Sequence, residues 1–165
     1  MGQPRARADR HGRRGGRGSG GVSEQVPAAL AEIRDEFLEL PEPERLQLLL
    51  EFADELPEMP AEYADHPERT ERVAECQSPV FIVLALDEDG LVRMHASAPP
   101  EAPTTRGFAS ILAQGLTGLS PDEVLAVPVD YPQSIGLTRA VSPLRISGMT
   151  GMLMRAKRQV AALAA

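Results

Sequence analysis

The apolar residues in the first third of the chain recur at helical spacing. One stripe, with gaps of three, four and three residues, consists of Leu30, Ile33, Phe37 and Leu40. The stripe ends at the stretch LPEPE (40–44), because proline breaks one helix and can begin another. A second helix is predicted to follow and to end at LPEMP (56–60). Its apolar face consists of Leu46, Leu49, Leu50, Ala53 and Leu56.

The middle of the chain changes to the patterns of β-strands. A short alternating segment, TERVAE (70–75), leads to Cys76, and the continuous apolar run PVFIVLAL (79–86) is typical of a buried strand. The turn DEDG (87–90) and the alternating segment LVRMHAS (91–97) complete a hairpin. We therefore expect Cys76 on a turn between two strands. A proline-rich loop, SAPPEAP (97–103), follows the hairpin.

The rest of the chain is predicted to be helical. TTRGFASILAQGL (104–116) is one helix, SPDEVLAV (120–127) starts with a capping box of Ser120 and Glu123, and SIGLTRAV (134–141) is a short helix. A long helix covers 142–164, with basic residues near its C-terminal half, where the helix dipole favours them. Because the strands are grouped, the predicted fold class is α+β, an antiparallel β-sheet covered by helices in the order α-α-β-β-β-α-α-α.

Charge divides the chain into three parts. Residues 1–21 hold six Arg and one Asp, residues 22–75 hold sixteen acidic and four basic side chains, and the remainder is neutral. We predict a disordered, basic Gly/Arg-rich tail over 1–21 and a single domain over 22–165. The tail is interpreted as dispensable or as an artefact of the gene start, and the alternative is an arm that binds nucleic acid or an acidic surface. The acidic helix faces are a solvated surface or, alternatively, a docking surface for a basic partner.

Cys76 is the only cysteine, so the chain cannot form an internal disulfide. With no long apolar run and no signal peptide, this indicates a soluble protein of the reducing cytoplasm. The possible thiol and imidazole ligands, which have no metal-binding spacing, are Cys76, His11, His66 and His95. From the residues alone, three interpretations stay open for Cys76: a packed apolar residue, a reactive thiol, or a hydrolase-type nucleophile with His95 as its base.

The stretch RVAECQSPVFIVLALDEDGLV (72–92) resembles the signature of the SufE family of sulfur-acceptor proteins, in which the active cysteine lies in GCQS before a Val-rich strand. EAPTTRGFASIL (101–112) is similar to the family's Asp-Ala-x-x-x-x-Gly helix start. SPLRISGMTGMLMRAKRQV (142–160) resembles its Ser-Pro-x-Arg-x-x-Gly helix. With the two opening helices and LPEMP, the resemblance covers about residues 26–162.

This chain departs from the family pattern at three places. Glu75 stands where the family usually has Gly, and we expect its carboxylate to disfavour the Cys76 thiolate and its side chain to restrict the loop. Glu101 replaces the family's Asp and is one methylene longer. SAPP (97–100) replaces the usual Gly-Asp-Ser type of approach. We expect these differences to alter the geometry of the loop.

The resemblance implies a bacterial protein that accepts sulfur from a cysteine desulfurase of the SufS type and activates that enzyme. Cys76 would carry the persulfide to an iron–sulfur scaffold, without turning over as an independent enzyme. PLP belongs to the desulfurase, so no cofactor or metal is expected here. Further site residues, which position the loop or bind the partner, are Gln77, Ser78, Glu101 and Arg145.

These roles have plainer alternatives. Gln77 and Ser78 would then only cap the turn, and Arg145 would satisfy backbone carbonyls at a helix start. We expect a monomer or weak dimer that binds neither nucleic acid nor membrane. Two other functions stay open: a stand-alone thiol enzyme that uses Cys76 with His95, and a non-catalytic interaction domain.

Overall fold

The computed structural model describes residues 25–165, so the predicted tail at 1–21 and the predicted domain start at residue 22 lie outside the described residues. Two helices, α1 (Ala28–Glu39) and α2 (Glu42–Asp54), come first. The short helix α3 (Ala61–Ala64) and the 3-10 turn η1 (Pro67–Arg69) lead to β1 (Glu71–Arg72), β2 (Phe81–Leu86) and β3 (Val92–Ser97). Four helices complete the fold: α4 (Pro103–Leu116), α5 (Pro121–Leu125), α6 (Tyr131–Ser134) and α7 (Pro143–Ala164).

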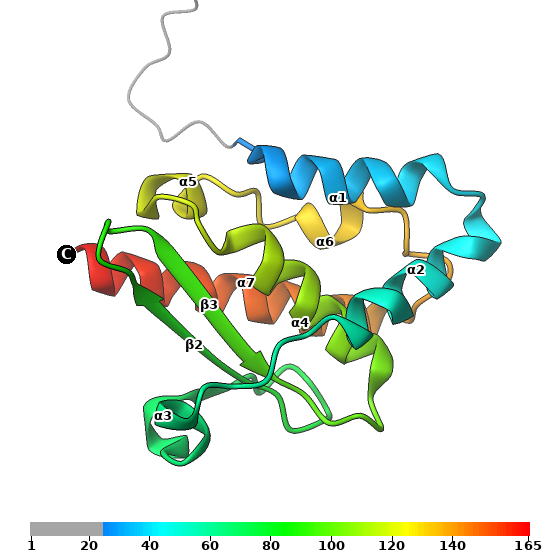
Figure 1. Ribbon diagram of the computed structural model, residues 1–165. Coiled ribbons are helices and arrows are strands. Elements are labelled where there is room, and N and C mark those ends of the chain that lie inside the picture. Colours follow the sequence, from blue (N-terminus) through cyan, green and yellow to red (C-terminus); the bar gives the residue numbers. More distant parts are fainter. Residues whose placement is uncertain (1–24) are drawn as a thin grey trace, which may run out of the picture.

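The three strands form one antiparallel sheet in the order β1-β2-β3. In the β2–β3 hairpin, Phe81 is opposite Ser97 and Leu86 is opposite Val92. Gly90 in the connecting turn has a φ of 77°, which a residue with a side chain adopts only with strain. The predicted hairpin is confirmed, and it places the segment that carries Cys76 at the end of the sheet opposite this turn (Figure 1).

One face of the hairpin is covered by α4 and α7, and α1 and α2 pack in turn on α4 (Figure 1). Every second side chain of β3 points to the same face of the sheet. Val92, Met94 and Ala96 point to the covered face and are buried in the same hydrophobic cluster as the inner faces of the helices. That cluster runs from Leu30 in α1 to Val160 in α7. The predicted α+β class, with an antiparallel sheet covered by helices, is confirmed.

The apolar face predicted for the second helix was partly wrong. Leu49, Ala53 and Leu56 are buried, but Leu46 is 38% exposed and Leu50 is only half-buried. Phe52 lies in the core instead and stacks on Phe37 with a centroid distance of 5.8 Å. An aromatic partner in α1 therefore turns the helix toward Phe52 and leaves Leu46 at the surface.

The helix predicted over 134–141 is absent: α6 ends at Ser134, and turns follow it. Tyr131 anchors this region by donating its hydroxyl hydrogen to the Leu30 carbonyl over 2.7 Å, and Gly136, with a φ of 80°, prevents helical continuation. The expected element order also lacked α3 and η1, and it gave three helices after the sheet although four segments were predicted there; four helices are present. The capping box is confirmed, because Ser120 Oγ accepts the Glu123 N–H and the Ser120 N–H donates to Glu123 Oε1.

Over residues 25–165, no helix is long and apolar enough to cross a membrane.

Candidate functional site

Cys76 lies in the middle of a short loop whose two ends are fixed in the core. Val73 and Val80 are fully buried, and the Val73 N–H donates to the Val80 carbonyl over 2.9 Å. This bond closes the base of the loop formed by residues 74–79. Within the loop, the Cys76 N–H donates to the Val73 carbonyl over 3.1 Å, and the cysteine side chain turns inward until the residue is only 8% exposed.

The thiol opens onto a cleft of about 130 Å³. Three segments far apart in the sequence line it: the cysteine loop, the first turn of α4 with the residues before it, and the first turns of α7. The lining residues are Glu75, Cys76, Gln77, Ser78, Glu101, Ala102, Pro103, Thr105, Leu144, Arg145 and Gly148. All five residues predicted for the site, Cys76, Gln77, Ser78, Glu101 and Arg145, are therefore brought together in one cleft.

Apart from Glu75, which pairs with Arg155, the predicted polar site residues of this cleft are not engaged in holding the fold. Within residues 25–165, no hydrogen bond or ion pair joins the side chains of Gln77, Ser78, Glu101 or Arg145 to another residue. Arg145 satisfies no described carbonyl, and only its backbone N–H is used, as a donor to Ser142 Oγ at the start of α7. These groups are free to meet a molecule that enters the cleft.

Glycines of α7 allow the loop to lie close to the helix. A Cβ atom at Gly148 would stand 3.1 Å from Cys76 Sγ, and one at Gly151 would stand 2.7 Å from Glu75 Cδ. The two glycines are three residues apart and so share a face of the helix. The Gly of the Ser-Pro-x-Arg-x-x-Gly pattern is Gly148, so this motif position is the surface on which the thiol rests.

Burial raises the pKa of the Cys76 thiol from 9.0 to about 11. The Glu75 carboxylate adds to this rise, as the sequence predicted, but the nearby Arg155 guanidinium opposes it. Hydrogen bonds from Arg155 hold the pKa of Glu75 below its usual range, so this carboxylate is charged and paired. With its loop packed on α7, Cys76 is a neutral, sheltered thiol at pH 7.

His95 does not belong to this cleft. It follows Met94 on β3 and precedes Ala96, and since both of these are buried toward the helices, the His95 ring lies on the opposite face of the sheet. There it packs against Tyr63 of α3 with a centroid distance of 5.6 Å. The interpretation of Cys76 and His95 as a nucleophile and its base is therefore wrong.

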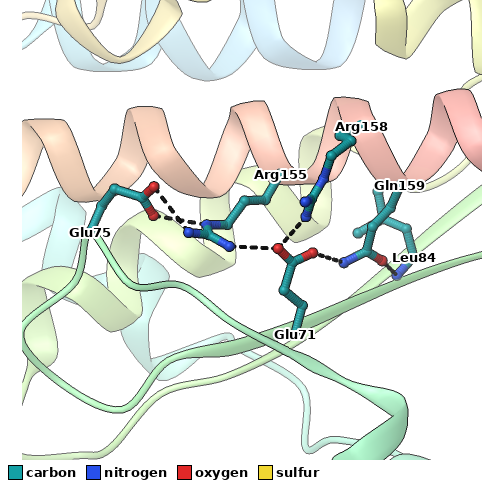
Figure 2. A network of polar contacts seen from close by, with 6 residues as sticks. All are labelled: Glu71, Glu75, Leu84, Arg155, Arg158 and Gln159. Carbon is teal, nitrogen blue, oxygen red and sulfur yellow. Dashed lines mark hydrogen bonds and ion pairs between the residues drawn. The ribbon is translucent and has the colours of Figure 1, made fainter.

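Sequence reasoning missed Arg155, which was assigned to the helix dipole. Figure 2 shows that its guanidinium reaches across from α7 and contacts two carboxylates, Glu71 and Glu75. A signal for this contact was present in the sequence. Two acidic residues, Glu71 and Glu75, stand four apart around the start of the cysteine loop, and two basic residues, Arg155 and Arg158, stand three apart and so share one face of the last helix. Gly148 and Gly151 were likewise not assigned a role.

Across the part of the chain that the structure describes, no cluster of three or more His, Cys, Asp or Glu side chains could hold a metal ion. The fold and the cleft define a class of small α+β domain that presents one sheltered thiol on a loop between strands. The chain belongs to the SufE family, since the family model described as the Fe-S metabolism associated domain matches residues 31–160. Its setting is thus iron–sulfur metabolism.

Similar proteins agree with this assignment. An uncharacterized SufE-like protein of Mycobacterium tuberculosis is 49% identical over 135 residues, which are 82% of this chain and 93% of that protein. An uncharacterized SufE-like protein of Synechocystis is 31% identical over 124 residues, 74% of each chain. The solution structure of a hypothetical protein from Thermus thermophilus superimposes with a TM-score of 0.75 at 37% identity, covering 85% of this chain and 98% of that one.

Proposed function

We propose that this protein accepts sulfur from a PLP-dependent cysteine desulfurase of the SufS type, activates that enzyme, and passes the sulfur to an iron–sulfur scaffold. The observation that carries the proposal is the cleft in which Cys76 meets Gln77, Ser78, Glu101 and Arg145 from three distant segments. The family's association with Fe–S metabolism supports it. The protein itself uses no cofactor in this proposal, because PLP belongs to the desulfurase.

The chemical step is a thiol exchange that balances without an outside oxidant. The Cys76 thiolate attacks the outer sulfur of the desulfurase persulfide, the sulfur–sulfur bond of that persulfide breaks, and the desulfurase cysteine leaves as a thiolate. Cys76 then holds the transferred sulfur as its own persulfide. Clearing sulfur from the desulfurase frees its cysteine for the next cycle, so the acceptor also acts as an activator.

A carrier of this kind must protect its sulfur in transit and expose it on arrival. The packed loop serves the first need, because the Cys76 side chain is buried against Gly148. The second need requires the loop to move outward, and residues 74–79 can do so about the closed base at Val73 and Val80. The raised pKa of the packed thiol keeps the sulfur-free protein unreactive between transfers, since the thiolate is the reactive form.

We assign the remaining cleft residues to the encounter with the desulfurase. Gln77 and Ser78 directly follow Cys76 on its own loop and offer short polar groups to the incoming persulfide. Glu101 and Arg145 have opposite charges and lie near the N-termini of α4 and α7, and they orient the loop or contact the partner. The exposed Leu144 beside Arg145 adds an apolar contact at the same rim. The partners are the desulfurase and the scaffold, and the protein is a monomer or weak dimer.

Persulfide formation tests this proposal directly. Incubation with desulfurase, PLP and cysteine should add one sulfur atom to the intact mass of the protein, and Cys76→Ser should show no gain. Wild type should also increase desulfurase turnover, measured as alanine released, whereas Cys76→Ser and Cys76→Ala should not.

A rival function and a failure of the proposal predict different results in the same assay. If Cys76→Ser stimulates the desulfurase as well as wild type does, the protein is a non-catalytic interaction domain. If Cys76 gains no sulfur and wild type gives no stimulation, the carrier proposal is wrong altogether.

A further inference from the structure

Residues 74–79 are fastened to the rest of the described protein at very few points. Apart from the Cys76 N–H bond within the loop base, the polar fastening is the contact of Glu75 with Arg155 of α7. Arg155 Nε donates to Glu75 Oε2 over 2.8 Å, and Arg155 Nη2 donates to Glu75 Oε1 over 3.1 Å. This paired geometry is the strong form of an arginine–carboxylate contact.

The other side of Arg155 is anchored independently of the loop. Its Nη1 donates to Glu71 Oε2 over 2.6 Å, and Glu71 also accepts hydrogen bonds from Arg158 and Gln159. Gln159 Oε1 in turn accepts the backbone N–H of Leu84 in β2 over 2.9 Å. Figure 2 shows this row of contacts between α7 and the strands. Arg155 is thus held in position whether or not Glu75 is attached.

We propose that Arg155 is a positioning residue that holds the Cys76 loop closed through Glu75, and that release of this ion pair exposes the thiol for sulfur transfer. Opening breaks only the half of the network that faces solvent: the Glu75 side chain is 42% exposed and that of Glu71 only 22%. Arg155 keeps Glu71 as its partner after opening, and the released Glu75 carboxylate, already 42% exposed, is hydrated by solvent. The sulfur-transfer part of this inference rests on the proposed function, whereas loop closure does not.

The test measures access to Cys76 without any desulfurase. Alkylation by iodoacetamide at pH 8 should be about three- to tenfold faster in Arg155→Gln than in wild type, because losing an exposed but bidentate ion pair raises the open fraction by about this factor. Arg158→Gln is the matched control, since Arg158 contacts Glu71 but not Glu75. It should alkylate at nearly the wild-type rate. Arg155→Lys keeps the positive charge but cannot donate the two parallel hydrogen bonds of a guanidinium, so its alkylation rate should lie between those of the two other variants.

Salt distinguishes a positioning role from a general loss of structure. Added NaCl screens exposed ion pairs, so wild-type alkylation should accelerate with salt, and Arg155→Gln, which has no ion pair to lose, should accelerate less. Urea unfolding of each variant shows whether its alkylation follows global unfolding. If Arg155→Gln folds poorly, Gly151→Ala serves instead, because its added methyl group would displace the Glu75 side chain while leaving both charged residues in place.

Equal alkylation of wild type and Arg155→Gln, or equal acceleration by Arg155→Gln and Arg158→Gln, would overturn the proposal. If both Arg155→Gln and Gly151→Ala alkylate faster only in proportion to their global unfolding, it fails as well. These outcomes are separable from a failure of the proposed function, for a loop that opens as described but never gains sulfur would contradict the carrier role alone.

Discussion

At the scale of the residue, the nucleophilic role proposed for Cys76 conflicts with the burial of its side chain. A nucleophilic thiol needs a low pKa and an open approach, whereas Cys76 is almost fully buried and its pKa is raised to about 11. The conflict is resolved if the packed loop is the storage form and the open loop the reactive one. The chemistry of the residue then depends on where the loop lies.

The raised pKa leads to a prediction about pH. In the folded protein, ultraviolet absorbance should detect the Cys76 thiolate only as the pH approaches about 11, and in urea the same thiol should titrate near 9.0. Because the folded pKa is the higher one, the stability from keeping the thiol neutral is fully present below pH 9.0 and is lost as the pH rises toward about 11. Cys76→Ser should lack this loss, which amounts to at most about 3 kcal/mol. Identical titrations in both states would contradict the buried location.

The substitution Glu75→Gly should accelerate both alkylation of Cys76 and sulfur acceptance, by about three- to tenfold at low salt. The carboxylate disfavours the thiolate, and its pairing with Arg155 holds the loop. No described residue other than glycine has a positive φ, so the closed loop itself does not need Gly at this position. Glycine would help only the open loop, by widening its choice of φ.

Salt separates these contributions. The part of the acceleration that comes from removing the Glu75 charge should shrink as NaCl is added. The part that comes from the greater backbone freedom of glycine should remain. Equal alkylation and transfer rates for wild type and Glu75→Gly at low salt would show that Glu75 has no influence on the thiol.

At the scale of the element, periodicity predicted the helices and the hairpin but not how each helix is rotated. Leu46 and Phe52 are both apolar, and only the stacking of Phe52 on Phe37, an interaction between two helices, decides which of them is buried. The missing helix at 134–141 has the same kind of cause, a hydrogen bond from Tyr131 to Leu30, 101 residues away. For the site, family motifs identified the cleft residues, whereas Arg155 required the contact between α7 and the loop to be seen.

Arg106 of α4 joins elements that meet near the cleft. Its guanidinium donates to the backbone carbonyls of Ala53, Leu56 and Ala98, so it fastens the end of α2 to the segment that leads to Glu101. Arg106→Met should lower the free energy of unfolding in urea by about 2–3 kcal/mol, because partly buried carbonyls lose their donors. Thr105→Ala at the neighbouring position, where the structure records no side-chain hydrogen bond, is the control and should change it little. A loss below about 0.5 kcal/mol would contradict the joining role.

At the scale of the whole molecule, charge is distributed unevenly along the chain. The net charge of −7 combines a basic segment over 1–21 with a strongly acidic one over 22–75. In the fold, the acidic side chains of α1 and α2 lie at the surface, and a groove there is lined by Glu36, Glu39, Glu44 and Glu51. The cysteine cleft opens between α4, α7 and the loop, so the acidic groove and the thiol belong to different parts of the molecule.

Deletion of residues 1–21 should leave stability and desulfurase activation unchanged, because this segment has no apolar pattern and the motifs of the site all lie beyond it. The midpoint of urea unfolding and the alanine release rate of the desulfurase measure the two properties. A large fall in activation at unchanged stability would instead assign the basic segment to docking of the partner.

The hydrogen bond between Val73 and Val80 also sets a limit on distance. This bond fixes Val73 at the base of the loop, and Cys76 is three residues further along the chain. At 3.8 Å for each Cα–Cα step, the Cα atom of Cys76 can lie at most roughly 11 Å from that of Val73. Such a short tether limits how far the thiol can enter a partner's active site without close contact between the two surfaces. If Cys76 accepts sulfur as proposed, the donor must bring its sulfur within this distance of the cleft, and the fit between the two surfaces then limits which sulfur donors the protein can serve.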